Sequence, residues 1–588
     1  MTQPKYSQSD VVGIEPKHIT YVKDNQGRGH DMLVTKEVVH LKDGTTVDQL
    51  GFKEDYRRPY WVTQKGRQKH REKKDYEYAS NCQKYTCTQL ELSSAVARTM
   101  NDYSSGPNPP IRRLSRSPYL YGVDVSTPCL RKAEYRKKWP GLFSFNRVAA
   151  GDIETNVHSR ENEIICMSAT SKNKAILVYL KSWLGDTPDP IGQTHAMAKE
   201  HIGEILTARG IELEVLVVDT PADIVITVMN RMHSWKPEFF TFWNMDFDVT
   251  HMLRTLDNAA IDPATVFSDP SVPEQYRYCN YKRGPAQKTT ASGKSMSINI
   301  EDRWNWITHP ASFQIVDSMP IYRILRLTNG KDSSYALDYI LRKELNMTKL
   351  KFDKVSHLSG LRWHEVMQEK YKIEYGVYNI FDSISLELLD EKTNDLASDV
   401  TLFSKNSDYK NFNSNPRRLC DDMHFWYLRR DEPCVIGSSS DNPVSELDKV
   451  VVGHSDWIVT LPSYMAAPTG LACIQEFKDY QSLIFTHVSD LDIVSTYPVI
   501  SQALNIARET CVMEFGRMKG IREHERREVG VNLTAGRVNA IEICEKILGA
   551  PKLDDLLHEF KDSLGKKSLG GDSTGTRSPR EVIVDSLL

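Results

Sequence analysis

Short apolar runs follow one another closely in the part of the chain that begins near residue 147. Arg147–Ile153, Glu163–Ala169 and Ala175–Leu180 are each short and apolar enough to be predicted as strands. Their order along the chain indicates strands that lie beside one another. The pattern therefore predicts a sheet at the start of this segment.

Apolar residues spaced by about four positions then predict helices, and one aromatic run predicts a further strand. In chain order these elements are a helix near Ala222–Met232, a strand Phe239–Trp243, a helix from about Val249 to Leu256 and a helix from about Tyr371 to Asp395. Strands that come first and then alternate with helices indicate an α/β layer with a mixed sheet. The expected fold class is α/β, within a multidomain α+β chain.

Shifts in these patterns predict the domain organisation. Strand-like runs such as His18–Val22 and Met32–His40 alternate with basic and Pro-rich connections near the N-terminus. Near the other end, a strand Leu483–Val488 precedes a predicted helix-rich region, Leu504–Phe560, and a polar tail. The expected boundaries are 1–146 for an N-terminal domain, 147–395 for the α/β domain, 396–480 for a connector, 481–560 for a further partial domain and 561–588 for a mobile tail.

Composition narrows the class of protein. The 588 residues carry a net charge of −3 and contain no apolar stretch long enough to span a bilayer. The polar N-terminus has no signal core, so we expect a soluble, cytoplasmic protein that is not secreted. Ten cysteines without zinc-ribbon spacing predict reduced thiols. Basic runs at 65–74 and 131–138 are compatible with nucleic-acid contacts or with an ordinary solvated surface.

The sequence Asp152-Ile153-Glu154 is the first candidate for catalytic chemistry. Residues two apart on a strand point to the same side, so both carboxylates would face one cavity while Ile153 enters the core. Such a triplet also occurs by chance as two surface acids. Hydrolysis of a phosphodiester by two hard cations needs several carboxylates that converge from different elements.

Two further segments supply acidic residues in suitable places. An aromatic strand leads through Asn244 to Asp248, where a helix is expected to begin, although Asp246 or Asp248 could instead be only a helix N-cap. Tyr378 and Asp382 are four apart in a predicted helix, so they share a face and can reach the same site. A solvated aspartate beside a half-buried tyrosine is the alternative interpretation.

Taken in order, these segments resemble the three exonuclease motifs of the proofreading domains in family B DNA polymerases. The resemblance implies an RNase-H-like, DnaQ-like domain over 147–395 that hydrolyses DNA from its 3′ end with two Mg²⁺ or Mn²⁺ ions. It makes Asp152, Glu154, Asp248 and Asp382 the metal ligands and catalytic residues, with Tyr378 beside the attacking water. Asn244 would lie near the DNA, and Phe247 is a candidate for stacking on a splayed base.

A later segment, Asp490–Pro498, resembles the first palm motif of the same family. The resemblance implies that Asp492 is a catalytic, metal-holding aspartate and that Ser495, Thr496 and Tyr497 contact the incoming nucleotide. A simple strand end with a turn at Pro498 is the alternative. In this reading 481–560 is a partial palm, and 396–480 returns to the N-terminal domain.

The sequence contains neither a second palm aspartate motif nor a fingers helix that would grip a triphosphate. We therefore expect this protein to be the proofreading chain of a split DNA polymerase of the T-even-like, large-phage branch. It would act inside an infected bacterium. Its partners would be DNA, a second chain with the fingers, the rest of the palm and the thumb, and a sliding clamp. A truncated piece of a longer polymerase would explain the missing motifs equally well. A free-standing 3′–5′ exonuclease and an inactive module that binds DNA or replisome proteins are the alternative functions.

Overall fold

The chain divides into two units, Met1–Ser439 and Ser440–Leu588, which are described separately here. Asp492, Ser495, Thr496 and Tyr497 lie outside the residues that the structure describes. The computed structural model describes residues 6–70, 73–74, 76–102, 106, 109–289, 295–327, 330–397, 415–437, 513–517, 527–533 and 536–539.

A six-stranded mixed sheet forms the centre of residues 147–397. Its strand order is β11-β10-β9-β8-β12-β17. Strands β8, β12 and β17 run parallel to one another, whereas β9 is antiparallel to both of its neighbours and β10 is parallel to β11. The bounds are Val148–Thr155 (β8), Ile164–Ser171 (β9), Lys174–Leu180 (β10), Glu212–Val218 (β11), Phe239–Phe242 (β12) and Gln314–Asp317 (β17). The predicted α/β class with a mixed sheet is confirmed.

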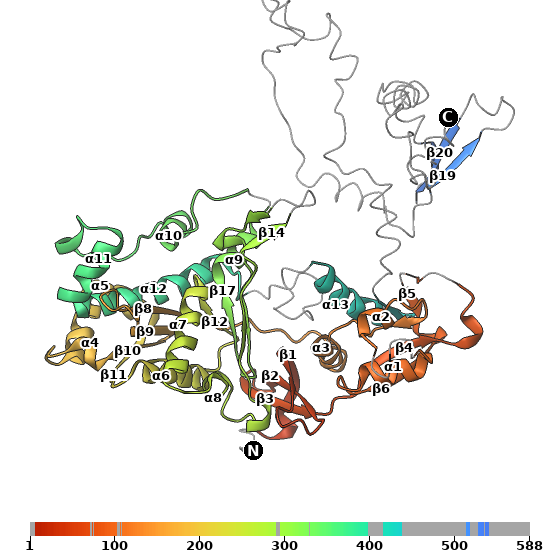
Figure 1. Cartoon of the computed structure of the whole chain (residues 1–588), viewed down its shortest axis with the longest axis horizontal. Coiled ribbons are helices and arrows are strands. Elements are labelled where there is room, and N and C mark those ends of the chain that lie inside the picture. The colour runs from red at the N-terminus through yellow and green to blue at the C-terminus, as the bar shows by residue number, and fades with distance from the viewer. Residues whose placement is uncertain are drawn as a thin grey trace, which may run out of the picture. The chain divides into compact units, whose positions relative to one another are not determined.

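Helices cover both faces of this sheet (Figure 1). Strand β9 is buried on both sides, and the helices that contact it are α6 (Pro221–Trp235), α7 (Met245–Asn258) and α12 (Lys372–Thr393). Ser168 of β9 shares a hydrogen bond with Ser383 of α12, at 2.7 Å between the two hydroxyl oxygens. Because side chains alternate along a strand, the opposite face of β9 packs against α6 and α7.

Local sequence explains where these helices begin. Thr220 and Asp223 form a reciprocal capping box around Pro221, so α6 starts with its first amide groups satisfied. Helix α12 approaches β10 so closely at Gly376 that any side chain there would collide with the hydroxyl group of Tyr179. Glycine, which has no side chain, permits this close contact. The long helix α5 (Pro190–Arg209) and strand β11 were absent from the elements expected from the sequence.

Smaller elements surround the sheet. The remaining helices and strands of this region are α4 (Lys181–Leu184), α8 (Pro263–Phe267), α9 (Ser318–Leu325), α10 (Leu337–Leu345), α11 (Gly360–Lys370), β13 (Asn280–Lys282), β14 (Gln287–Thr289), β15 (Ser295–Ser297) and β16 (Trp306–Thr308). Strands β13 and β16 pair antiparallel, as do β14 and β15. Helix α11 packs on α12.

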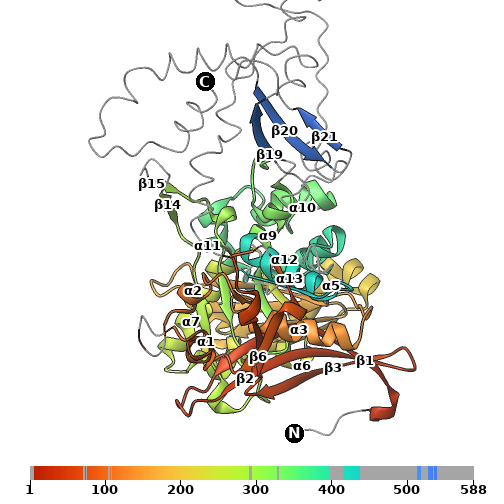
Figure 2. The same cartoon turned by 90° about the vertical axis from the view of Figure 1, so that its right-hand side faces the viewer.

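The N-terminal part contains two antiparallel three-stranded sheets, with orders β1-β2-β3 and β6-β4-β7. Strand β18 pairs with β5, so residues 434–436 join this part of the chain. Helix α13 packs on α3 (Figure 2). The elements are β1 (Val11–Lys23), β2 (Asp31–Leu41), β3 (Thr46–Glu54), β4 (Arg58–Thr63), β5 (Tyr76–Tyr78), β6 (Cys82–Cys87), β7 (Leu120–Tyr121), β18 (Cys434–Ile436), α1 (Leu92–Met100), α2 (Ile111–Leu114), α3 (Thr127–Lys138) and α13 (Asn415–Leu428).

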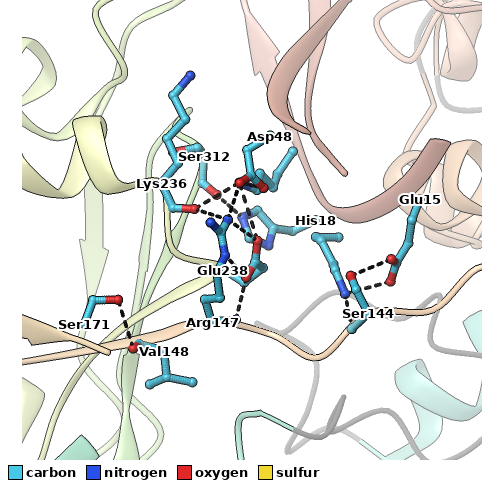
Figure 3. Close-up of polar contacts among 12 residues, drawn as sticks. Glu15, His18, Asp48, Ser144, Arg147, Val148, Ser171, Lys236, Glu238 and Ser312 are labelled. Carbon is cyan, nitrogen blue, oxygen red and sulfur yellow. Dashed lines mark hydrogen bonds and ion pairs between the residues drawn. The ribbon is translucent and has the colours of Figure 1, made fainter. Parts of the chain in front are cut away.

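A buried ionic network joins the first sheet to the central sheet (Figure 3). Glu238, just before β12, lies 3.4 Å from the ammonium group of Lys36 on β2 and 3.1 Å from the guanidinium group of Arg147. Asp48 of β3 binds the same two cations, at 2.7 Å each. Burial alone would raise the pKa of Glu238, but Lys36 and Arg147 hold it below its usual value. The junction therefore depends on charges that are paired inside the protein.

The second unit contradicts one expectation from the sequence. Within the region expected to be helix-rich, the described residues form an antiparallel sheet of β19 (Met513–Arg517), β20 (Arg527–Leu533) and β21 (Gly536–Asn539). That prediction is wrong for these residues. Val529, Val531 and Leu533 alternate with polar or small residues, which is the two-residue period of a strand.

Two further features concern chemistry and location. Cys82, Cys87, Cys166 and Cys434 are buried free thiols, and burial raises the pKa of Cys82 and of Cys87 to about 11. Among the residues that the structure describes, no helix is long and apolar enough to cross a membrane.

Replacement of Glu238 by Gln tests the ionic junction. The side chains of Lys36 and Glu238 are 0% and 1% exposed, so the variant leaves a buried ammonium group with less compensation. We expect a loss of about 3–5 kcal/mol in the free energy of unfolding, measured by urea denaturation. Glu214→Gln is the control, because its partner Arg231 is half-exposed and the loss should stay below about 1 kcal/mol. Equal losses in both variants would contradict this assignment.

Candidate active site

The carboxyl ends of the three parallel strands meet at one edge of the central sheet. Asp152 and Glu154 lie near this end of β8 on the same side of the strand, and Ile153 between them is buried in the core. The amide Nδ2 of Asn379 donates to Asp152 at 2.7 Å, and the hydroxyl of Tyr375 donates to Glu154 at 2.5 Å. Both donors belong to α12, so this helix orients the two carboxylates.

Asp248 reaches the same edge from α7. The helix begins at Met245 with Asn244 as its N-cap, so Asp248 lies within the first turns and is not the cap. It is 4% exposed and accepts a hydrogen bond from the backbone amide of Ile153, which ties it to β8. Asp246, two residues earlier, instead binds Arg283 at 2.6 Å and accepts from Tyr281, away from the carboxylate cluster.

Helix α12 contributes the fourth carboxylate. Tyr378 and Asp382 lie one helical turn apart and are 8% and 3% exposed. The ammonium group of Lys349 donates to Asp382 Oδ2 at 2.5 Å and to the hydroxyl oxygen of Tyr378 at 2.9 Å. Lys349 comes from the loop after α10, so a distant segment places a positive charge beside the acidic cluster.

The four carboxyl groups lie close enough to alter one another's ionisation. Burial, followed by the charges of Glu154, Asp382 and Asp248, raises the pKa of Asp152 well above its usual value. Burial also raises the pKa of Asp248, and it raises the pKa of Glu154 to about 7. Burial raises the pKa of Asp382 against the opposing charge of Lys349. All four carboxyl groups can therefore be ionised together only when protons are replaced by cations at this edge.

Burial would lower the pKa of Lys349, but Asp382, Tyr378 and Asp152 hold it well above its usual value. Lys349 is therefore a charged ammonium group in this cluster. The pKa of Tyr378 is raised by burial and by Asp382, so its phenol keeps its proton. The site combines anionic oxygen ligands with one fixed cation and one neutral hydroxyl group.

The donor chemistry fits a hard divalent cation, because four carboxylates are the oxygen ligands that Mg²⁺ and Mn²⁺ prefer. Asp382 Oδ1 is buried and accepts no hydrogen bond. The side-chain oxygen of Asn244 is likewise buried and accepts none. As the described side chains lie, however, no three His, Cys, Asp or Glu residues form a ready group of metal ligands. Lys349 occupies the cationic position at Asp382, and a metal ion would compete with it there.

A fifth acid at this edge was not expected from the sequence. Asp317 ends β17, is 2% exposed and accepts from Asn305 Nδ2 at 3.1 Å. Burial raises its pKa to about 7, although Asn305 and the backbone amides of Met245 and Met319 lower it. Its contact with Met245 holds the start of α7, which carries Asp248.

The structure brings together Asp152, Glu154, Asp248, Tyr378 and Asp382, all of which the sequence pattern selected. It leaves Phe247 at the surface, 43% exposed, with its ring 4.5 Å from that of His251. Tyr375, Asn379 and Lys349 were missed. The spacing of Asn379, three residues before Asp382, could have indicated it, whereas no sequence signal places Lys349 in the site.

No protein-family model matches the sequence, and no curated protein matches it.

Replacement of Asp152 by Asn tests the mutual repulsion in the site. A carboxyl group whose folded pKa is raised stabilises the protein below its unfolded pKa and loses that contribution as pH rises through the folded value. In EDTA, we expect Asp152→Asn to melt about 2–4 °C above wild type near pH 8, and we expect this difference to shrink as pH falls toward the unfolded pKa of about 3.9. Differential scanning fluorimetry measures this difference in melting temperature.

Asp246→Asn is the matched control and should change in the opposite direction. Burial would raise the pKa of Asp246, but Tyr281 and Arg283 hold it below its usual value. Its ionised form is therefore stabilising at high pH, and the variant should melt below wild type near pH 8. If the difference in melting temperature between Asp152→Asn and wild type does not vary with pH, the proposed repulsion among the carboxyl groups is contradicted.

Proposed function

We propose that this chain is a 3′–5′ DNA exonuclease that removes terminal nucleotides by hydrolysis, with an RNase-H-like, DnaQ-like arrangement of the central sheet. The observation that carries the proposal is the gathering of Asp152, Glu154, Asp248 and Asp382 at one edge of the sheet, with raised pKa values. Such a cluster has no benefit for stability, so it favours a catalytic purpose over a structural one.

Asp152, Glu154, Asp248 and Asp382 would hold two Mg²⁺ or Mn²⁺ ions. When bound, such ions lower the pKa of a coordinated water and stabilise charge on a phosphate oxygen. The protein's own part is to fix the ligands before the substrate arrives. Asn379 orients Asp152, and the backbone amide of Ile153 orients Asp248, so two of the ligands are held by hydrogen bonds from the sheet and α12.

Tyr378 and Lys349 have complementary roles in this proposal. The phenol of Tyr378 keeps its proton, so it can donate a hydrogen bond to a non-bridging phosphate oxygen or orient a water molecule. The ammonium group of Lys349 is 2.9 Å from that hydroxyl oxygen and is therefore close enough to stabilise the same phosphate. If Lys349 released Asp382, the carboxylate would be free to bind a metal ion and the ammonium group would be free to stabilise the phosphate.

A single-stranded 3′ end is the expected substrate. Phe247 is exposed at the start of α7, the helix that carries Asp248, and its ring would be the one to stack on a base. Asn244, at the N-cap of the same helix, has a buried side-chain oxygen with no hydrogen-bond partner. Stacking and amide contacts of this kind bind a strand without reading its sequence.

A wider role in replication is proposed from the sequence pattern alone. In this role the chain proofreads for a family B-like DNA polymerase, contributes Asp492 and Tyr497 to the palm site, and pairs with a second chain. A free-standing exonuclease is the second candidate, and the carboxylate cluster favours it equally. An inactive binding module is disfavoured, because a cluster of buried like charges is costly when it has no cation to hold.

Two aspartates on α7 provide a matched test of the exonuclease. Asp248→Ala removes a residue of the carboxylate cluster, whereas Asp246→Ala removes one that binds Arg283 and Tyr281. On a 5′-labelled single strand with Mg²⁺, we expect wild type and Asp246→Ala to shorten the DNA stepwise from its 3′ end. Asp248→Ala should be slower by at least about 100-fold.

The double variant Asp152→Ala/Glu154→Ala should be equally inactive while retaining the wild-type circular dichroism spectrum. Equal rates for the Asp246 and Asp248 variants would contradict the assigned site. Absence of digestion by the folded wild-type chain would favour the binding module.

A further inference from the structure

We infer that Tyr375 is a positioning residue of this site, which fixes the carboxylate of Glu154 through a hydrogen-bonded support that extends to helix α11. The inference rests on the proposed function, because the carboxylate that it positions is one of the proposed metal ligands. Tyr375 does not itself belong to the carboxylate cluster, and no sequence motif selected it.

When Glu154 is ionised, as a metal ligand must be, the hydrogen bonds around Tyr375 have one consistent arrangement. A tyrosine hydroxyl has one proton to donate, and Tyr375 donates it to Glu154 Oε2 at 2.5 Å. The contacts with Gln368 Nε2 at 3.2 Å and with His364 Nδ1 at 2.8 Å must then be hydrogen bonds that the hydroxyl oxygen accepts. His364 therefore carries its proton on Nδ1, and three groups together fix the hydroxyl of Tyr375.

Helix α11 is tied to β8 by the same residues. His364 and Gln368 are four apart and lie on one face of α11. Gln368 donates to the carbonyl oxygen of Thr155 at 2.8 Å, and its own side-chain oxygen accepts from the amide of Val157 at 3.0 Å. Gln368 thus contacts both the hydroxyl that holds Glu154 and the backbone that directly follows Glu154.

The ring of Tyr375 is held independently of its hydroxyl. It is 0% exposed, and its ring lies 6.1 Å from that of Tyr378 with an interplanar angle of 9°. Trp183 and Trp363 contact other parts of the ring, at centroid distances of 6.3 and 5.9 Å. Tyr375→Phe therefore removes the hydrogen bonds while the packing of the ring is retained, which separates a positioning role from a structural one.

Residues that orient a metal ligand from outside the ligand set change metal affinity or activity by about 10–100-fold when they are removed. The consequence for Glu154 is specific. Without the hydroxyl of Tyr375 its carboxylate can rotate, and the oxygen offered to a cation is no longer fixed. We expect the affinity for the metal to fall.

The test compares Tyr375→Phe with Tyr179→Phe in the full chain. Tyr179 is also fully buried and its ring also lies beside that of Trp183, but its hydroxyl is bonded to Thr194, at 3.1 Å, and to no carboxylate. Mn²⁺ binding is measured by electron paramagnetic resonance of the free ion. We expect Tyr375→Phe to raise the dissociation constant by about 10–100-fold and Tyr179→Phe to leave it within about 2-fold.

A second readout is the Mg²⁺ concentration for half-maximal digestion of a 5′-labelled strand, which should rise by the same factor for Tyr375→Phe. Gln368→Met, which removes one donor to the hydroxyl, should give a smaller shift in the same direction. Equal Mn²⁺ affinity in wild type, Tyr375→Phe and Gln368→Met would overturn the inference.

The two ideas fail in different ways. A wild-type chain that binds Mn²⁺ but digests no DNA would overturn the proposed exonuclease, and the binding data would still decide the role of Tyr375. A wild-type chain that digests DNA with an unchanged metal requirement in Tyr375→Phe would overturn the positioning role alone. A wild-type chain that binds no Mn²⁺ would overturn both.

Discussion

Repulsion among four carboxyl groups at one edge of the central sheet is the constraint on which the arrangement of this domain depends. Asp152, Glu154, Asp248 and Asp382 come from β8, α7 and α12, and burial with mutual charge raises their pKa values. A fold tolerates such a cluster only where neighbouring hydrogen-bond donors and cations offset the repulsion between the carboxyl groups. Lys349 supplies a positive charge, while Asn379 and Tyr375 supply donors from the helix that crosses the sheet.

The rest of the domain makes this cluster rigid. Helix α12 is buried along most of its length because it packs on β8, β9 and β10, so residues on one helix face support the whole edge. At the opposite end of β8, Arg147 and Glu238 anchor the strand to the N-terminal sheet through Lys36 and Asp48. Strand β8 is therefore fixed at both ends.

The sequence predicted those features that depend on local spacing. Asp152 and Glu154 share a side of a strand, and Tyr378 and Asp382 share a face of a helix, because both relations follow from backbone geometry alone. Lys349 and Tyr375 could not be predicted, since their roles arise only when distant segments pack together. Helix α5 was missed for a related reason: only Thr194, Ala198 and Ile202 are buried in it, so its apolar stripe is faint. The helix-rich prediction near β20 failed where a two-residue period was overlooked.

The central claim is that the carboxylate edge holds two divalent cations. The most direct measurement is a crystal structure with Mn²⁺ and a deoxynucleoside monophosphate, with the ions located by anomalous scattering. The account predicts two peaks about 3.5–4 Å apart among Asp152, Glu154, Asp248 and Asp382, with Lys349 displaced from Asp382. A structure at saturating Mn²⁺ with no peak at this edge, and with Lys349 still bonded to Asp382, would contradict it.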